Sequence, residues 1–165
     1  MPTVALGLGS NIRPQQHLQQ ALDALHARYG RLLTSGVFES EPVGFDGPNF
    51  LNMVVVLETT ESLASLSRFL KDHEDRHGRV RHGPKASGRT VDIDILLYGE
   101  LCGTYEDVEL PRPEITENAF VLCPLAQVLG DTLLPGTTQS IGELWRRYDR
   151  AQRLWPVDFT QGSSA

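Results

Sequence analysis

The sequence has few cysteines and no long apolar stretch, and both features narrow the possible classes of protein. Its two cysteines, Cys102 and Cys123, are not in a C-x-x-C arrangement. We therefore expect reduced, structural thiols and neither a disulfide framework nor a zinc site. No apolar run is long enough to span a bilayer, and residues 1–7 lack the basic start of a signal peptide. These features predict a cytoplasmic protein with no membrane partner.

Positive charge and aromatic residues are also scarce. Lys and Arg total 15 against 21 Asp and Glu, the formal net charge is -6, and aromatic residues make up 7% of the chain. Nucleic-acid-binding proteins normally present a broad basic face with interleaved aromatics, so we expect no nucleic-acid partner. The length of 165 residues suits one domain, expected at residues 1–158, followed by a disordered tail at 159–165.

The apolar pattern predicts an α/β domain of the α+β type. Strands are expected at residues 3–8, 32–38, 50–57 and 89–97, with helices at 14–29 and 62–76. This order, strand, helix, strand, strand, helix, strand, is the ferredoxin-like βαββαβ arrangement. The strand at 50–57 is apolar on both faces and should be central.

A C-terminal helical extension is expected beyond this core. Residues 109–114 should form a loop, a short helix should begin near Pro124, and a last amphipathic helix should cover residues 141–148. Trp145 and Trp155 are interpreted as core residues.

Two carboxylates share one face of the predicted strand at 89–97. Alternation places Val91, Ile93 and Ile95 on the core face, and it places Asp92 and Asp94 together on the other. Same-face neighbours on a strand are roughly 7 Å apart, close enough to hold a shared Mg²⁺ or a pair of Mg²⁺ ions. A half-buried strand with a solvated polar face is the alternative, although Asp is depleted from strands.

Positive charge concentrates just before this strand. Residues 76–89 contain five cations, two histidines and no acid, and their glycines and proline predict a mobile loop. A solvated loop is the simpler interpretation of such a segment alone. Beside the Asp pair, however, it favours a polyphosphate bound between cations and Mg²⁺.

Two further patterns suggest a ligand. Phe50 and Asn52 share one face of the central strand, and a ring beside an amide suits recognition of a flat nitrogen heterocycle; a core Phe next to a satisfied Asn is the alternative. Gly7 and Gly9 begin a dinucleotide-binding fingerprint, but Ile12 occupies the third glycine position. These glycines are better explained by a sharp turn or by a ligand close to the backbone.

Together these residues resemble the 6-hydroxymethyl-7,8-dihydropterin pyrophosphokinase family, whose members transfer diphosphate from ATP to a pterin alcohol in folate biosynthesis. The resemblance covers about three quarters of the chain, from the first strand to about Leu125. Its motifs are residues 9–11, 50–52, 78–81, 89–95, 120–122 and 124–125.

The resemblance implies a role for each group of residues. Asp92 and Asp94 would hold two Mg²⁺ ions that bridge the phosphates of ATP, the co-substrate. The pterin would lie between Phe50 and Phe120, and its edge would contact Ser40, Asn52 and the backbone of Val43. The nucleotide side would include Glu74, Arg79, Arg81 and Arg89, with Arg79 and Arg89 closing on the phosphates; our own assignment adds Arg112 to the ATP-binding residues. We expect a monomer with small-molecule substrates.

The chain departs from the family pattern at four positions. Ala86 stands where Trp is usual, Gly88 where Pro is usual, Arg112 where His is typical and Asn118 where Arg is typical. We expect the guanidinium of Arg112 to replace part of the missing charge; an exposed loop arginine is the alternative. A divergent paralogue that binds pterin or nucleotide with weak or no transfer, or a non-catalytic binding module, also stays open.

Overall fold

A six-stranded antiparallel sheet forms the centre of the computed structural model, which describes residues 1–44, 46–78 and 90–159. The strands are β1 (Thr3–Ser10), β2 (Leu33–Thr34), β3 (Val37–Ser40), β4 (Phe50–Glu58), β5 (Asp92–Tyr98) and β8 (Leu154–Val157). Their spatial order is β5-β1-β4-β3-β8, and β2 also pairs with β4. The apolar strand β4 is central, as its sequence predicts.

The connections confirm the ferredoxin-like order. β1 and β3 both pair antiparallel with β4, so β1 and β3 run parallel with β4 between them. The helix α1 (Pro14–Tyr29) joins these two parallel strands, and α2 (Leu63–Arg76) joins β4 to β5 in the same way. Each half is therefore a split βαβ unit.

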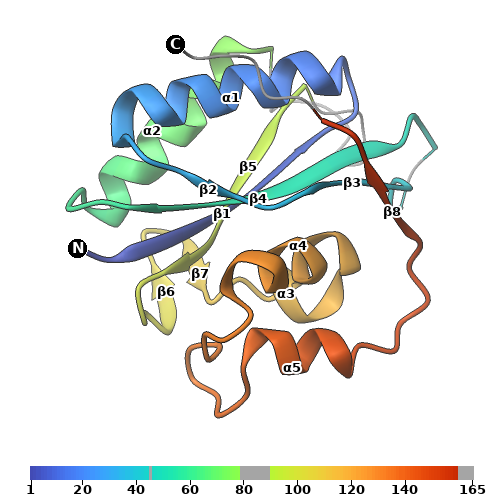
Figure 1. The fold of residues 1–165 in the computed structure, drawn as a ribbon. Helices are drawn as coiled ribbons and strands as arrows, with labels where there is room; N and C mark the ends of the chain where they lie inside the picture. The colour runs from blue at the N-terminus through green and yellow to red at the C-terminus, as the bar shows by residue number, and fades with distance from the viewer. Residues whose placement is uncertain (45, 79–89, 160–165) are drawn as a thin grey trace.

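Helices cover both faces of the sheet (Figure 1). α1 and α2 lie on one face, over a core that includes Leu51, Met53, Val55 and Leu57 of β4. The other face carries α3 (Glu114–Glu117), α4 (Ala119–Leu129) and α5 (Ile141–Arg146). Val54 and Val56 of β4 pack into this second core, because alternate side chains of a strand point to opposite faces.

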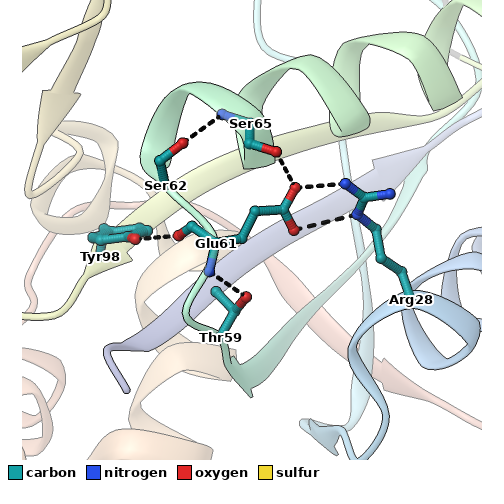
Figure 2. Close-up of polar contacts among 6 residues, drawn as sticks. All are labelled: Arg28, Thr59, Glu61, Ser62, Ser65 and Tyr98. Atoms are coloured by element: carbon teal, nitrogen blue, oxygen red, sulfur yellow. Dashed lines mark hydrogen bonds and ion pairs between the residues drawn. The ribbon is translucent and has the colours of Figure 1, made fainter.

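Glu61, just before α2, connects three elements at the end of the sheet where β1 begins (Figure 2). Its carboxylate accepts hydrogen bonds from Arg28 at 3.2 and 2.6 Å and from the Ser65 hydroxyl. Its backbone carbonyl accepts a hydrogen bond from the Tyr98 hydroxyl at the end of β5. Arg28 lowers the pKa of Glu61 to about 2. This cluster ties the end of α1 to the start of α2.

The predicted boundaries needed several corrections. The expected strand at 32–38 is divided into β2 and β3. Where the two strands separate, the Ser35 N–H donates to the Val54 carbonyl, and the Ser35 hydroxyl oxygen accepts from the Val54 N–H. The helix expected near Pro124 begins at Ala119, so the proline lies inside α4. The last helix ends at Arg146. The first residues of the expected loop at 109–114 belong to β7 (Val108–Leu110), which pairs with β6 (Gly103–Tyr105).

The C-terminal segment also differs from its prediction. Residues 154–157, for which no element was predicted, form β8, an edge strand beside β3. Trp155 is 37% exposed and is therefore not a core residue, whereas Trp145 packs partly buried against the second core. Most of the expected tail, residues 160–165, lies outside the described residues. No helix in the described ranges is long and apolar enough to cross a bilayer.

Candidate active site

A pocket of about 260 Å³ lies on the sheet face that carries α4. It is lined by four strands of the sheet (β1, β3, β4 and β5), by the loop after β3, and by residues from Arg112 to the start of α4. The lining includes Gly7, Gly9, Ser40, Glu41, Val43, Phe50, Asn52, Asp92, Asp94, Arg112, Glu114, Asn118 and Phe120. Residues from distant parts of the sequence thus meet in one cavity.

The floor of the pocket is β1, which lies between β4 and β5 and has no side chain at two positions. Gly9 pairs with Asn52 of β4 on one side and with Asp92 of β5 on the other. Gly7 pairs in the same way with Val54 and Asp94. The two glycines therefore form a shallow trough between the carboxylates of β5 and the side chains of β4. Above Gly7, the Leu96 side chain lies 3.4 Å from the position that a Cβ atom would take.

The space above Gly9 is tight. A Cβ atom added there would lie 3.3 Å from Asn52 Oδ1 and 3.8 Å from Phe50 Cδ1. Both glycines lie within β1 and neither has a positive φ, so the expected sharp turn is wrong for them. The other interpretation, close approach of a ligand to the backbone, stays a prediction.

The two carboxylates of β5 face the pocket as the alternation predicts. Asp92 and Asp94 line it, while Ile93 and Ile95 are buried in the core beneath α1 and α2. Burial and the charge of Asp92 raise the pKa of Asp94 well above its usual value, and Arg112 opposes this shift. The pocket therefore concentrates negative charge that a cation would relieve.

Arg112 lies between two acids at this end of the pocket. Its Nη2 is 3.4 Å from Asp94 Oδ1, and its Nε is 2.6 Å from Glu114 Oε2. All three side chains are about one third exposed. Arg112 is therefore part of the pocket, and the alternative of an isolated, exposed loop arginine is wrong.

Glu74 lies behind the acidic strand and is not among the pocket-lining residues. Its side chain is buried, and its Oε2 accepts a 2.7 Å hydrogen bond from the backbone N–H of Ile93. Because Ile93 lies between Asp92 and Asp94, this bond fixes the backbone that carries both carboxylates. Contact between Glu74 and a nucleotide stays a prediction.

The pocket is also lined by an amide, Asn52, and by two aromatic residues, Phe50 and Phe120. Asn52 Nδ2 donates to Ser40 Oγ at 2.7 Å and to the Phe38 carbonyl at 3.3 Å. These bonds satisfy the amide nitrogen and leave Oδ1 over Gly9, facing the cavity. Phe50 enters from β4 and Phe120 from the first turn of α4.

Sequence reasoning found most but not all of the lining. Of the predicted residues that are described, Ser40, Val43, Phe50, Asn52, Asp92, Asp94, Arg112 and Phe120 meet in the pocket. Arg79, Arg81 and Arg89, with the departures Ala86 and Gly88, lie outside the described residues. Glu41 and Glu114 were missed, although Glu114 follows Arg112 closely enough to have suggested a partner.

Comparison with protein families matches residues 5–130 to the 7,8-dihydro-6-hydroxymethylpterin-pyrophosphokinase family, HPPK. The chain belongs to this family. A Haemophilus influenzae relative, a 2-amino-4-hydroxy-6-hydroxymethyldihydropteridine pyrophosphokinase, is 35% identical over 90% of this chain and 94% of its own length. A relative of the same description from Pseudomonas aeruginosa is 37% identical over 80% and 83%.

Solved structures support the fold of this HPPK-family chain. The wild-type HPPK-DHPS of Plasmodium falciparum superposes with a TM-score of 0.71 at 14% identity. The match covers 89% of the present chain but only 44% of the Plasmodium chain. This likeness, at low identity, is evidence for the α+β architecture alone.

Proposed function

We propose that this pocket binds a hydroxymethyldihydropterin at its Asn52 end and the phosphates of ATP at its Asp92/Asp94 end. Both molecules are substrates of the HPPK-family reaction, which transfers diphosphate from ATP to 6-hydroxymethyl-7,8-dihydropterin in folate biosynthesis. The observation that carries the assignment of the two ends is the row Asp92, Gly9, Asn52 across three strands. This row has a carboxylate on one side of the trough and an amide on the other, which supports metal binding at one end and heterocycle binding at the other.

The Asn52 end suits a pterin because its groups complement a flat ring with polar edges. Phe50 and Phe120 provide aromatic surface for stacking. Asn52 Oδ1 is positioned to accept a hydrogen bond from a ring N–H, while its amide nitrogen is held by Ser40. A fixed acceptor above a glycine floor favours one orientation of the ring, and so directs its hydroxymethyl group along the trough.

The Asp92/Asp94 end suits Mg²⁺ on the chemistry of its donors. Two carboxylates share one face, and burial together with the charge of Asp92 raises the pKa of Asp94. Among the described residues no set of three or more His, Cys, Asp or Glu could hold a metal ion. This fits Mg²⁺, which is commonly bound by one or two carboxylates together with substrate phosphates. Bound Mg²⁺ would neutralise charge on those phosphates.

Arg112 adds a cation beside the carboxylates. Its link to Asp94 holds the guanidinium at the pocket, where it would contact a phosphate of ATP and contribute positive charge that His would supply only when protonated. We assign the same general role to Arg79, Arg81 and Arg89 on sequence grounds. The pterin hydroxyl would attack the β-phosphorus in line, releasing AMP.

We further propose that the protein acts as a cytoplasmic monomer on small-molecule substrates, with no nucleic-acid or membrane partner. The acidic composition supports the absence of a nucleic-acid partner. Gel filtration with light scattering would test the oligomeric state, since a monomer should elute with a mass near 18.3 kDa.

A turnover assay with matched variants tests the proposed function. Wild-type protein with ATP, Mg²⁺ and 6-hydroxymethyl-7,8-dihydropterin should form the pterin diphosphate, and omission of any one component should stop the reaction. Asp92→Asn and Asp94→Asn should each reduce the rate at least about 100-fold, because each removes a charged metal ligand. Asp131→Asn, at an exposed position after α4, is the control and should match the wild type.

Pterin binding without turnover in the wild type would instead favour a divergent paralogue. Mg²⁺-dependent turnover retained in either Asp variant would contradict the metal assignment.

A further inference from the structure

Two consecutive residues near the C-terminus reach opposite sides of the pocket. Gln152 contacts the start of α4, which carries Phe120, and Arg153 contacts Glu41, which follows Ser40 in the chain. Both lie beyond residue 130, where the match to the family ends. The residues that make these contacts therefore lie outside the part of the chain that matches the family model.

Gln152 supplies hydrogen bonds that the start of α4 lacks. Asn118, the residue that precedes this helix, makes no side-chain hydrogen bond to the helix backbone. Instead Gln152 Oε1 accepts from the Ala119 N–H at 2.8 Å, and Gln152 Nε2 donates to Asn118 Oδ1 at 3.0 Å. Free N–H groups at a helix start need such partners. The bonds hold the two residues directly before Phe120.

Tyr148 adds a second contact in the same place. Its hydroxyl donates a 2.8 Å hydrogen bond to the backbone carbonyl of Glu117. The segment from Tyr148 to Gln152 thus spans residues 117–119 at the base of the Phe120 side of the pocket.

Arg153 and β8 hold the other side. Arg153 Nε lies 2.8 Å from Glu41 Oε1, and its guanidinium lies 5.2 Å from the Trp155 ring centroid. β8 pairs with β3 in a register that sets Leu154 opposite Ser40. Ser40 in turn accepts the hydrogen bond from Asn52. The C-terminal strand therefore supports the strand and loop that carry Ser40, Glu41 and Val43.

We propose that residues 148–157 form a C-terminal clasp that sets the spacing between the two pterin-contacting sides of the pocket, with Gln152 and Arg153 as its positioning residues. This inference rests on the proposed function. The two residues are adjacent in the chain, so a shift of one side relative to the other must break or strain one of their contacts. The clasp thereby keeps Phe120 and the Ser40 loop at a separation suited to one flat ring.

The ion pair between Arg153 and Glu41 should contribute little to the stability of the fold. Both side chains of the ion pair are more than half exposed, at 71% for Arg153 and 51% for Glu41. Exposed ion pairs typically contribute little to folding. Their removal should thus affect the pocket more than the fold, which separates a positioning role from a structural one.

Steady-state kinetics of Gln152→Ala and Arg153→Ala would test the clasp. Each variant should raise the KM for the pterin about three- to tenfold. The KM for ATP and the kcat at saturating pterin should stay close to the wild-type values. Arg153→Ala should also leave the melting temperature nearly unchanged. Arg153→Lys, which keeps the cation, should recover most of the wild-type KM. The matched control is Arg150→Ala, because Arg150 is exposed in the same segment, and it should behave as the wild type.

Unchanged pterin KM in both alanine variants would overturn the clasp, as would equal increases in the KM for ATP and pterin. An effect of Gln152→Ala confined to the melting temperature would show that the residue only stabilises α4. A wild-type protein without turnover would overturn the proposed function and the clasp together, whereas an active wild type with unaffected variants would overturn the clasp alone.

Discussion

Arg112 Nη2 lies 3.4 Å from Asp94 Oδ1, while its Nε lies 2.6 Å from Glu114 Oε2. One guanidinium is thus shared between a carboxylate assigned to metal binding and a carboxylate at the start of α3. Glu114 keeps the arginine close to Asp94 and orients it. A phosphate entering this end of the pocket would meet a cation that is already in place.

Arg112→Ala should raise the KM for ATP about tenfold, because the variant loses a charged contact to phosphate. The KM for the pterin should change less, since Arg112 lies at the carboxylate end. Initial rates at varied ATP would measure this. Arg147→Ala, at an exposed position after α5, is the control. Unchanged ATP kinetics in Arg112→Ala would show that Arg112 does not replace the missing charge of the family pattern.

Asn118→Arg should reduce activity, although arginine is typical of the family at this position. Asn118 Oδ1 accepts a hydrogen bond from Gln152, and an arginine offers no acceptor there. The variant should therefore raise the KM for the pterin. Activity at or above the wild-type level would count against a role for the contact with Gln152.

Gly9→Ala should weaken pterin binding on the order of tenfold without unfolding the protein. The added methyl group would lie 3.3 Å from Asn52 Oδ1, so the amide would have to move from its position above the floor. Gly9 has no positive φ, so alanine fits the backbone. Calorimetry with the pterin and a melting curve would separate the two effects. Wild-type affinity in this variant would show that the trough is not the ring-binding surface.

Phe50→Ala and Phe120→Ala should each weaken pterin binding at least about fivefold, because an aromatic contact contributes on the order of 1 kcal/mol beyond the area that it buries. Tyr105→Ala, an exposed aromatic on β6, is the control. ATP affinity should stay close to the wild-type value in all three variants. Unchanged pterin affinity in both Phe variants, with the fold intact, would assign the two rings to the core instead.

His73 should make the folded protein less stable in mild acid. Its ring is buried and stacks on His77 at 4.0 Å between centroids. Burial, followed by the charges of His77, Arg76 and His17, lowers the pKa of His73 to about 4. The unfolded chain therefore binds more protons between about pH 6.5 and pH 4, so the free energy of unfolding contributed by neutral His73 is complete above pH 6.5 and is lost as the pH falls through this window.

Urea unfolding at pH 7.5 and pH 5 would measure this dependence. His73→Leu should lose less stability than the wild type over that interval, by on the order of 1–2 kcal/mol. His26→Gln removes an exposed histidine and should keep the wild-type dependence. Equal losses in His73→Leu and the wild type would show that other groups account for the acid sensitivity.

Much of the fold could be predicted because local patterns there agree with the tertiary structure. Pro14 in the first turn and Gly30 at the end fixed the bounds of α1, and alternation assigned β5 its two faces. Pro124 misled the prediction of α4, since proline is expected in the first turn of a helix, whereas this helix starts five residues earlier. β8 had no local signal, because its pairing with β3 is a long-range contact.

Site residues that are close together in one segment of the sequence could be predicted, whereas an arrangement that depends on pairing between strands could not. Asp92 with Asp94, and Phe50 with Asn52, are each visible as same-face pairs. The alignment of Asp92, Gly9 and Asn52 requires the sheet order, which no spacing in the sequence reveals. The sequence also did not reveal that the carboxylate of Glu74 accepts a hydrogen bond from the backbone of β5, while its predicted contact with the nucleotide stays a prediction. Tertiary contact decided its position.

The identity of the nucleotide product tests the central claim most directly. Wild-type protein should convert ATP to AMP, and not to ADP, with one pterin diphosphate formed for each AMP, and the reaction should require Mg²⁺. Chromatography of the nucleotides and pterins from one reaction would measure both products. Formation of ADP with a pterin monophosphate, or the absence of any product while pterin and ATP both bind, would contradict diphosphate transfer at the Asp92/Asp94 site.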